Sequence, residues 1–360
     1  MPDTTAPPRV SVLMTTWNGA GFIAESIASI LAQDFSDFEL VVIDDGSTDD
    51  TPAILTAIAD PRLRVLRPPH NLGIAGARNF GFAACRAPYV AALDHDDISL
   101  PGRLAAQFAY LERTPGIVLV GSDISIREGG RERASGHAGG APPSLMRWLL
   151  HIDNPLTYSS VMLRTSAVRA LGAFMRADRA PADDFDLYHR LLRVGEIARL
   201  EEVLTIYRWH ATNASHAQGA ALVAMAVDVL AEACTPWFGP AAGEAARLVI
   251  WHLSERHPAT DRATLARLGE VLERLLAGFC ATHPMPPATR AAIARAAGRA
   301  WWGAVRAAVR SGHPALLAEH RRAVTLRTAF RPTLPDRLAS CAIGGVRGAR
   351  HSIQDRFNRP

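Results

Sequence analysis

The sequence contains no lysine, few cysteines and no long apolar run. All 39 basic residues are arginine, which we attribute to compositional bias rather than to mechanism. The four cysteines are scattered without a Cys-x-x-Cys pair, which fits a reducing compartment and argues against a thiolate zinc site. No window of 18 or more uncharged apolar residues occurs, so no membrane-spanning helix is expected. Because the N-terminal residues also lack the basic and apolar regions of a signal peptide, we expect a cytoplasmic protein.

The charge is divided unevenly along the 360 residues. Residues 1–215 hold 20 Arg and 25 acidic residues, a balance of −5, and residues 216–360 hold 19 Arg and 10 acidic residues, a balance of +9, which together give the net +4. An acidic first part and a basic second part indicate two units with different partners. The arginine-rich part contains no recognisable nucleic-acid module, so we expect no nucleic-acid partner.

Strand patterns alternate with helical patterns through the first 100 residues. The strand patterns occupy residues 10–16, 38–43 and 64–66, and a fourth ends at Asp94. This alternation predicts an α/β fold with a mixed, mainly parallel sheet flanked by helices. Because ligands bind beyond the carboxyl ends of parallel strands, the polar residues that end these strands should meet in one crevice.

Three carboxylates, those of Asp94, Asp96 and Asp97, follow the fourth strand pattern within four residues. Such carboxylates repel one another unless a cation lies among them. Oxygen ligands suit Mg²⁺ or Mn²⁺, commonly with a phosphate on the other side of the ion. The alternative is an acidic loop that caps the helix beginning near Pro101. A second acidic strand end, Asp44-Asp45, favours the binding site, since both clusters should lie at the same edge of the sheet.

Two further positions allow both a structural and a chemical role. Asp183 and Asp184 open a helical pattern, where Asp is common as a cap, but one of them could remove a proton from an acceptor hydroxyl. His210, flanked by Arg208 and close to Asn213, is more often a structural histidine but could bind metal or a diphosphate.

Three other features receive a structural interpretation. Trp17 and Phe22 are expected to pack in the interior rather than to stack on a base. Residues 127–143 are polar and Gly-rich, which predicts a loop or hairpin tip that could cover the site after a ligand binds.

From about residue 216 the chain becomes rich in Ala and Arg, with helical periodicity broken by Gly and Pro. We expect a disordered N-terminus at 1–9, an α/β unit at 10–215, an all-helical region at 216–325 and a weakly periodic basic tail at 326–360. The helical part could form a homo-oligomer interface or make peripheral contact with an anionic membrane, at its inner face.

Five motifs occur in order over residues 10–104. They are Val-Ser-Val-Leu-Met-Thr-Thr-Trp-Asn at 10–18, Glu-Ser-Ile at 25–27, Asp-Asp-Gly-Ser-Thr-Asp-Asp-Thr at 44–51, Asn-Leu-Gly with Ala-Arg-Asn at 71–79, and Leu-Asp-His-Asp-Asp at 93–97. Weaker marks follow at 159–162, 183–187 and 207–215. In order and spacing these motifs resemble the family 2 glycosyltransferases of the GT-A (Rossmann-like) fold. The resemblance covers about residues 10–215 and leaves 216–360 uncovered.

The resemblance implies a role for each matching residue. It implies nucleotide binding by Thr15, Asn18, Asp44, Asp45, Arg78 and Asp94. It implies metal binding by Asp94, Asp96 and His210. Asp184 matches the catalytic base, and Asp183 stands where the family usually has Glu. We place Asp183, Arg208 and Asn213 on the acceptor or diphosphate side of the same site.

The resemblance implies an inverting glycosyltransferase with Mn²⁺ or Mg²⁺ as cofactor. Its donor would be a nucleotide-diphosphate sugar, with UDP the expected nucleotide, and its acceptor a hydroxyl of a glycan or a lipid-linked molecule in polysaccharide or surface-glycan synthesis. Two alternatives stay open: a catalytically inactive scaffold of the same fold, and a nucleotidyltransferase. The latter normally has a Gly-rich, basic phosphate loop after the first strand, where this chain has Thr15-Thr16-Trp17-Asn18.

Overall fold

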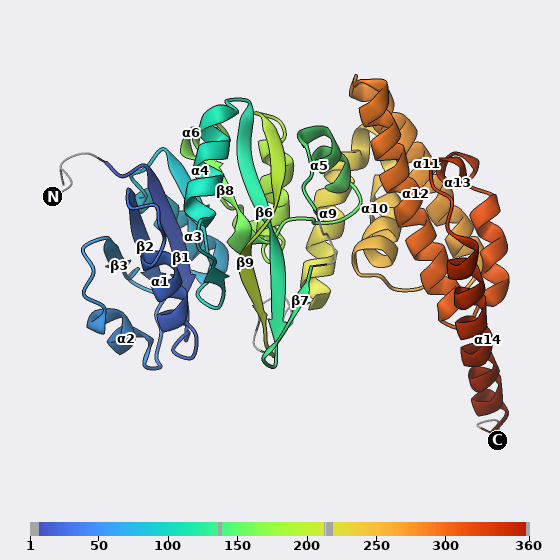
Figure 1. Cartoon of the computed structure of the whole chain (residues 1–360), viewed down its shortest axis with the longest axis horizontal. Coiled ribbons are helices and arrows are strands. Elements are labelled where there is room, and N and C mark those ends of the chain that lie inside the picture. The colour runs from blue at the N-terminus through green and yellow to red at the C-terminus, as the bar shows by residue number, and fades with distance from the viewer. Residues whose placement is uncertain (1–6, 136–138, 212, 214–218, 358–360) are drawn as a thin grey trace. The chain divides into compact units, whose positions relative to one another are not determined.

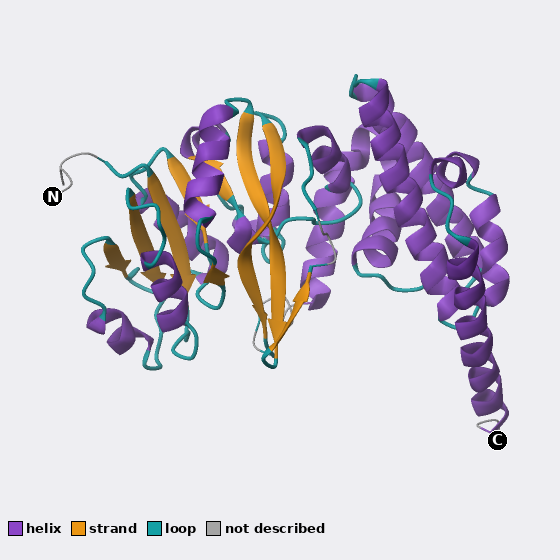
Figure 2. Ribbon diagram, viewed as in Figure 1, coloured by secondary structure: helices purple, strands orange, loops and turns teal. Residues whose placement is uncertain are grey.

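The computed structural model describes residues 7–135, 139–211, 213 and 219–357, with side chains described as far as Arg347 (Figure 1). The chain divides into two compact units, one of residues 1–147 and 154–226 and the other of residues 148–153 and 227–360. Figure 2 shows strands in the first unit, whereas the second unit is built of helices. The division falls inside helix α9 (Gly219–Phe238), not at residue 215 where the composition changes.

The first unit is organised by one mixed sheet with the strand order β3-β2-β1-β4-β8-β6-β9-β5, and β7 pairs with β6 beside this path. The strands that pair in parallel near the N-terminus are β1 (Val10–Thr16), β2 (Phe38–Asp44), β3 (Leu63–Leu66) and β4 (Tyr89–Ala92). The others are β5 (Ile98–Ser99), β6 (Ile117–Glu128), β7 (Arg131–Ala134), β8 (Met162–Arg164) and β9 (Glu196–Trp209). Strand β8 runs antiparallel between β4 and β6, and β9 runs parallel to β6. The predicted α/β fold with a mixed sheet is confirmed.

Helices cover both faces of this sheet, because alternate residues of a strand point to opposite sides. The helices are α1 (Ile23–Leu31), α2 (Thr51–Ala57), α3 (Gly73–Ala84), α4 (Arg103–Arg113), α5 (Pro143–Leu149), α6 (Thr165–Ala170) and α7 (Asp183–Leu191), with 3₁₀ turns η1 (Tyr158–Ser160) and η2 (Ala177–Arg179). Val12 and Met14 of β1 join the core cluster that contains Ile27 of α1. Leu13 faces α3, where a Cβ on Gly81 would lie 2.3 Å from Leu13 Cδ1. The glycine therefore lets α3 approach the sheet closely.

The strand register brings the acidic strand ends to one edge of the sheet. Thr16 pairs with Asp44 across β1 and β2. Leu13 pairs with Ala92 across β1 and β4, and Asp94 follows Ala92 by two positions. Because these strands are parallel, the polar residues that end them converge as predicted.

Residues 127–134 of the predicted segment 127–143 form a hairpin, since β6 extends to Glu128 and β7 returns alongside it. After residues 136–138, which lie outside the described residues, Gly139 donates its N–H to Asp123 Oδ2 at 3.2 Å. Arg199 donates to the carbonyl of Gly139 at 2.7 Å. The prediction of a hairpin tip is thus confirmed, and the covering of the site by this segment stays a prediction.

The second unit contains the helices of the C-terminal part. They are α9, α10 (Ala242–Val249), α11 (Arg262–Thr282), α12 (Pro287–Arg310), α13 (Val324–Ala329) and α14 (Leu334–Phe357), with the 3₁₀ segments η3 (Gly239–Ala241) and η5 (Pro314–Arg321) and a π-helical turn η4 (Ile250–Ser254). Leu272 and Phe279 of α11 and Trp301 and Val305 of α12 are buried in its core. The all-helical C-terminal region is confirmed.

The basic tail, predicted as weakly periodic, is mostly helical within the described residues. Asp336 of α14 accepts from Trp302 Nε1 at 2.7 Å and from Arg310 Nη2 at 3.1 Å. These bonds to α12 fix the last helix by polar contacts that a search for apolar periodicity does not detect.

Within the described residues, one helical stretch, Gly219–Ser254, is long and apolar enough to cross a membrane when judged by length and composition alone. Asp228 and Glu232 interrupt it, so a criterion of uncharged runs misses it. Buried helices of globular proteins can meet the same criterion. Leu230 and Cys234 of this stretch are buried.

Candidate active site

The three carboxylates after β4 form one cluster. Oxygen atoms of Asp94, Asp96 and Asp97 all lie within 4.8 Å of one another. Asp97 is fully buried, and this burial, together with the charges of Asp96 and Asp94, raises its pKa well above the ordinary value. Its Oδ1 accepts from the backbone N–H of Arg208 at 2.9 Å, while its Oδ2 has no partner among the described residues. An oxygen-rich cluster under like-charge repulsion fits a hard divalent cation.

His210 completes this cluster from the end of β9. Its Nε2 lies 3.0 Å from Asp96 Oδ2, and the side-chain amide of Asn213 donates to the same oxygen at 3.2 Å. Asn213 Oδ1 also accepts from the backbone N–H of His210 at 2.6 Å, which fixes the turn. The ring of Phe22 stacks on His210 with centroids 4.4 Å apart, so Phe22 packs as expected but against a site residue. The structure therefore brings the predicted Asp96, His210 and Asn213 together.

Arg78 links the acidic cluster to the helix that carries the predicted base. Its Nη2 donates to Asp94 Oδ1 and its Nη1 to Asp183 Oδ2, each at 3.1 Å. The guanidinium carbon lies 3.7 Å from the ring centroid of Tyr158. Burial opposes the charge of Arg78, but the carboxylates of Asp183 and Asp94 hold its pKa well above the ordinary value. These contacts tie the two carboxylates together, and the nucleotide contact that the resemblance implies for Arg78 stays a prediction.

Asp183 and Asp184 are neighbours at the start of α7 but point differently. Asp183 is 1% exposed and faces Arg78, whereas Asp184 is partly exposed. Asp184 accepts from the N–H of Phe185 at 2.6 Å and from the amide of Asn154 at 3.4 Å. Burial, reinforced by the charge of Asp183, raises the pKa of Asp184 to about 6. An accessible carboxylate with a pKa near neutrality is suited to remove a proton.

Asp44 and Asp45 hold the loops that follow β2. Asp44 Oδ1 accepts from the N–H of Ser47 at 2.9 Å, and Asp45 Oδ1 accepts from the N–H of Leu72 at 2.8 Å. Both side chains are buried. The predicted pair therefore shapes the loop edge of the site, and the amide of Leu72 places the start of α3 beside it.

Asn18 connects the end of β1 to the same loops. It adopts a left-handed backbone conformation with φ 53° and accepts from the N–H of Thr48 at 2.8 Å. Thr15 is half-buried, and its carbonyl oxygen lies 3.3 Å from Nδ1 of His95. Trp17 is 58% exposed, so the expectation that it packs in the interior is wrong.

Arg208 joins the acidic cluster to helix α1, and its predicted place on the acceptor or diphosphate side stays a prediction. The side chain is nearly buried and donates to Glu25 Oε2 at 2.5 Å and to Ser26 Oγ at 2.6 Å, both on α1. Burial lowers its pKa, partly offset by Glu25. Arg208 therefore ties β9 to α1, through the exposed carboxylate of Glu25 and the buried hydroxyl of Ser26.

Three side chains that touch the site escaped sequence reasoning. Ser159 Oγ accepts from the N–H of Asp94 at 3.0 Å and lies 3.2 Å from Asp94 Oδ2. Ser159 lies in the weaker motif at 159–162, and this motif was the signal in the sequence that could have identified it. Tyr158, under Arg78, and Asn154, beside the predicted base, carry no recognisable pattern because their roles depend on distant partners.

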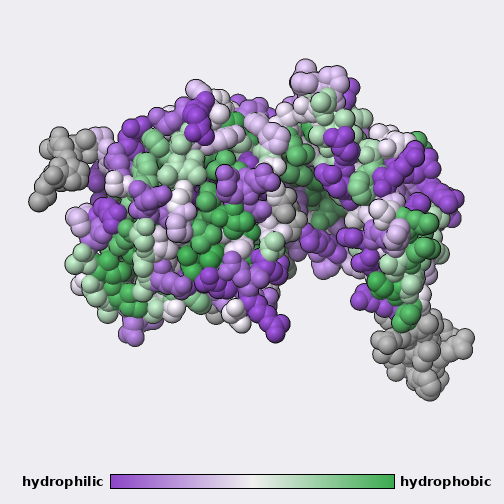
Figure 3. Space-filling model, viewed as in Figure 1, coloured by the Kyte–Doolittle hydropathy of each residue, from purple (hydrophilic) through white to green (hydrophobic). Residues whose placement is uncertain are grey.

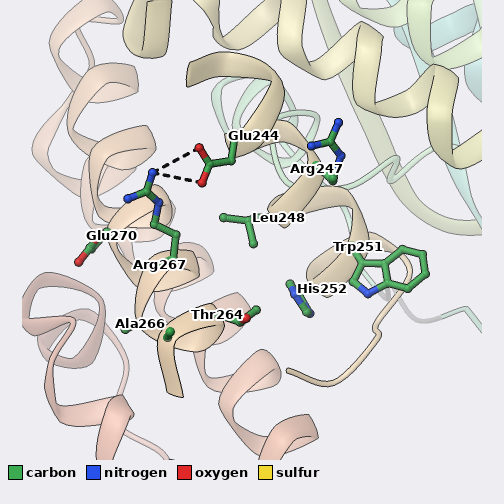
Figure 4. Close-up of a pocket in the computed structure, with 10 residues that line it drawn as sticks. Glu244, Arg247, Leu248, Trp251, His252, Thr264, Ala266, Arg267 and Glu270 are labelled. Carbon is green, nitrogen blue, oxygen red and sulfur yellow. Dashed lines mark hydrogen bonds and ion pairs between the residues drawn. The ribbon is translucent and has the colours of Figure 1, made fainter. Parts of the chain in front are cut away.

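A separate pocket of about 910 Å³ lies in the helical unit (Figure 4). Its walls come from α10, η4 and α11, and Figure 4 shows Arg267 paired with Glu244, at 3.1 Å, on one side of it. The residues that line it within the described chain include none of the predicted site residues.

The chain is similar to known glycosyltransferases. Residues 11–172 match the family model described as glycosyl transferase family 2. An uncharacterized glycosyltransferase of Haemophilus influenzae is 31% identical over 221 residues, which cover 58% of this chain and 68% of that protein. The succinoglycan biosynthesis protein ExoO of Rhizobium meliloti is 44% identical over 97 residues, 27% of this chain and 28% of that protein.

Solved structures agree at the level of the fold. The crystal structure of S. aureus TarS 1–349 in complex with UDP-GlcNAc superposes with a TM-score of 0.53 at 18% identity, covering 89% of this chain and 90% of that one. The likeness extends over most of the chain, and it confirms the GT-A fold with a helical C-terminal region. Together with the ordered motifs and the converging carboxylates, these similarities establish that the chain belongs to glycosyltransferase family 2 and is a glycosyltransferase.

Proposed function

We propose that this enzyme transfers a sugar, with inversion, from a UDP-sugar to a hydroxyl of a glycan or lipid-linked acceptor in polysaccharide or surface-glycan synthesis. The observation that carries the proposal is the partly exposed Asp184, with its raised pKa, linked through Asp183 and Arg78 to the acidic cluster at Asp94. ExoO is named for succinoglycan biosynthesis, and the TarS crystal contains UDP-GlcNAc, which support the acceptor class and the donor class.

Asp94, Asp96 and His210 are the proposed ligands of Mn²⁺ or Mg²⁺. The fit rests on the clustered oxygens and on the buried, repelled carboxyl of Asp97 beside them. When bound, such an ion supplies positive charge against the leaving diphosphate. Asn213 orients His210 and Asp96, so we propose that it acts on the diphosphate side through these two residues.

Asp184 is the proposed base. Its carboxylate accepts the proton of the acceptor hydroxyl while that oxygen attacks the anomeric carbon on the face opposite the diphosphate. The bond to the diphosphate breaks as the new glycosidic bond forms, and a single displacement inverts the configuration. Asp183 and Arg78 hold α7 in place for this step.

The nucleotide is proposed to lie along the loops after β1 and β2. Thr15 and Asn18 flank this edge, and the buried Asp44 and Asp45 keep its loops in place. The exposed indole of Trp17 is available there for stacking on the uracil. We further propose that the enzyme works in the cytoplasm, where nucleotide-sugars are available to it.

The test is incubation of the full chain with UDP-glucose, UDP-galactose and UDP-GlcNAc in the presence of Mn²⁺. Release of UDP that depends on Asp184, and is lost in Asp184→Asn, is the expected result. Formation of UTP and a sugar 1-phosphate when pyrophosphate is added together with the UDP-sugar would instead identify a nucleotidyltransferase. Failure to release either product from any donor would identify an inactive scaffold.

A further inference from the structure

Helix α14 turns its polar residues inward. Asp336 accepts from Trp302 Nε1 at 2.7 Å and from Arg310 Nη2 at 3.1 Å. Ser340 Oγ accepts from Arg310 Nε at 3.0 Å. One turn further along, a Cβ on Gly344 would lie 2.1 Å from the carbonyl oxygen of Val309. Residues four apart share one face of a helix, so the face that α14 packs on α12 is the polar one.

The opposite face of α14 is apolar and exposed to solvent. Leu334 is 65% exposed, Leu338 62%, Ile343 39% and Val346 58%. The exposed residues between them are Pro335, Ala339, Ala342 and Gly345. Figure 3 shows hydrophobic surface, in green, on the part of the molecule where Figure 1 labels α14. An ordinary surface helix has the reverse arrangement, and a continuous exposed apolar face of this kind marks a contact surface.

The charge around this face indicates what covers it. Exposed Arg331 precedes it, and exposed Arg347 follows it, with its Nη1 also donating to the carbonyl of Arg310 at 3.1 Å. Residues 321–360 contain 9 Arg and 2 Asp, and residues 216–360 carry a balance of +9. A second copy of the chain would bring two such basic segments together, whereas an anionic lipid surface attracts them. An exposed apolar face with arginines at its ends is typical of a helix that lies in a membrane surface.

We propose that α14 docks this chain on anionic phospholipid, with Leu334, Leu338 and Val346 inserted below the headgroups and the flanking arginines at the phosphates. The inference goes beyond the proposed transfer reaction, because no residue of the acidic cluster or of the proposed base takes part in it.

The test is flotation of the full chain with vesicles of phosphatidylcholine containing about 30 mol% phosphatidylglycerol at about 50 mM salt. The variant is Leu338→Gln with Val346→Gln, which removes apolar surface without changing charge. Val194→Gln is the matched control, since Val194 is 42% exposed in the first unit. Circular dichroism and thermal melting of all three proteins establish that they are equally folded.

We expect wild type and the control to float with the anionic vesicles, and the double variant to bind at least about tenfold more weakly. Binding of the wild type should also fall in pure phosphatidylcholine and at high salt. Equal binding by the double variant, or no binding by wild type at low salt, would overturn the proposal. Light scattering could also overturn the proposal. If wild type were a dimer and the double variant a monomer, a second copy of the chain would cover the face.

Discussion

Arg78 donates through Nη1 to Asp183 Oδ2 at 3.1 Å, although the two residues stand 105 positions apart in the chain. Their side chains are 5% and 1% exposed. The same guanidinium holds Asp94, so one buried cation joins the proposed metal side of the site to the helix that carries the proposed base. Removing one partner from such a buried arrangement leaves uncompensated charge behind.

Arg78→Met should therefore lower the free energy of unfolding of the first unit by about 3–5 kcal/mol. Unfolding of this unit in urea measures the change. The matched control is Arg67→Met, because Arg67 is 51% exposed and lies 3.6 Å from Asp44. For that exposed pair we expect a change of at most about 1 kcal/mol. Similar losses in both variants would argue against the linking role of Arg78.

Asp184→Asn should reduce transfer at least about 100-fold, measured as UDP release with donor and acceptor present. The substitution should not lower the free energy of unfolding. Since folding raises this pKa to about 6, the carboxyl stabilises the fold below its ordinary pKa of 3.8, and that contribution is lost as pH rises through 6. At neutral pH the Asp184→Asn variant should thus melt at the same temperature as wild type or at a higher one. Transfer at the wild-type rate would contradict the assignment of the base.

The pH dependence of kcat/KM should follow the ionisation of Asp184. Because the base must be unprotonated, kcat/KM should fall about tenfold per pH unit below the pKa and level off above it. Burial and Asp183 place this pKa at about 6. Initial rates at subsaturating acceptor across the acid range measure the profile. A profile that stays flat through pH 6, under conditions where chemistry limits the rate, would oppose the model.

Asp96→Ala should weaken Mn²⁺-dependent UDP binding by at least about tenfold, measured by titration calorimetry. The reason is that Asp96 contacts both His210 and Asn213 in the cluster. Chelation of the metal by EDTA should have the same effect on wild type. Asp60→Ala serves as the control, since Asp60 pairs locally with Arg62. Equal UDP affinity of wild type with and without Mn²⁺ would remove the metal from the proposed mechanism.

His320 should make the helical unit sensitive to acid. It is fully buried, and neither ring nitrogen has a hydrogen-bond partner among the described residues. Burial, with the charges of Arg337, Arg327 and Arg321, lowers its pKa to about 4. The neutral form therefore stabilises the fold above the ordinary pKa of 6.5, and this contribution is lost as pH falls through 4.

By pH 4 this loss should amount to up to about 3 kcal/mol. Urea denaturation of wild type and His320→Phe across this pH range measures it. The variant, which keeps an aromatic ring beside Trp302, should show a smaller decline with acid than wild type. Parallel pH curves for the two proteins would assign the acid sensitivity to other groups.

The sequence by itself determined the order of strands and helices in the first unit and the acidic residues at the strand ends. These features depend on apolar periodicity and local turn chemistry, which act over a few residues. The convergence of Asp44, Asp94 and Asp96 also followed, because parallel strands place their carboxyl ends at one edge. The ordered motifs were sufficient to indicate the family, and the match over residues 11–172 bears this out.

Only the tertiary structure decided where the long side chains point. Arg208 finds Glu25 at a separation of 183 residues, and Arg78 finds Asp183 at 105. No local pattern encodes such partners, because a buried guanidinium takes whichever carboxylates and carbonyls the packed elements present to it. The same holds for α14, which the sequence predicts only as part of a weakly periodic basic tail. Which of its faces is buried depends on Trp302 and Arg310 of another helix.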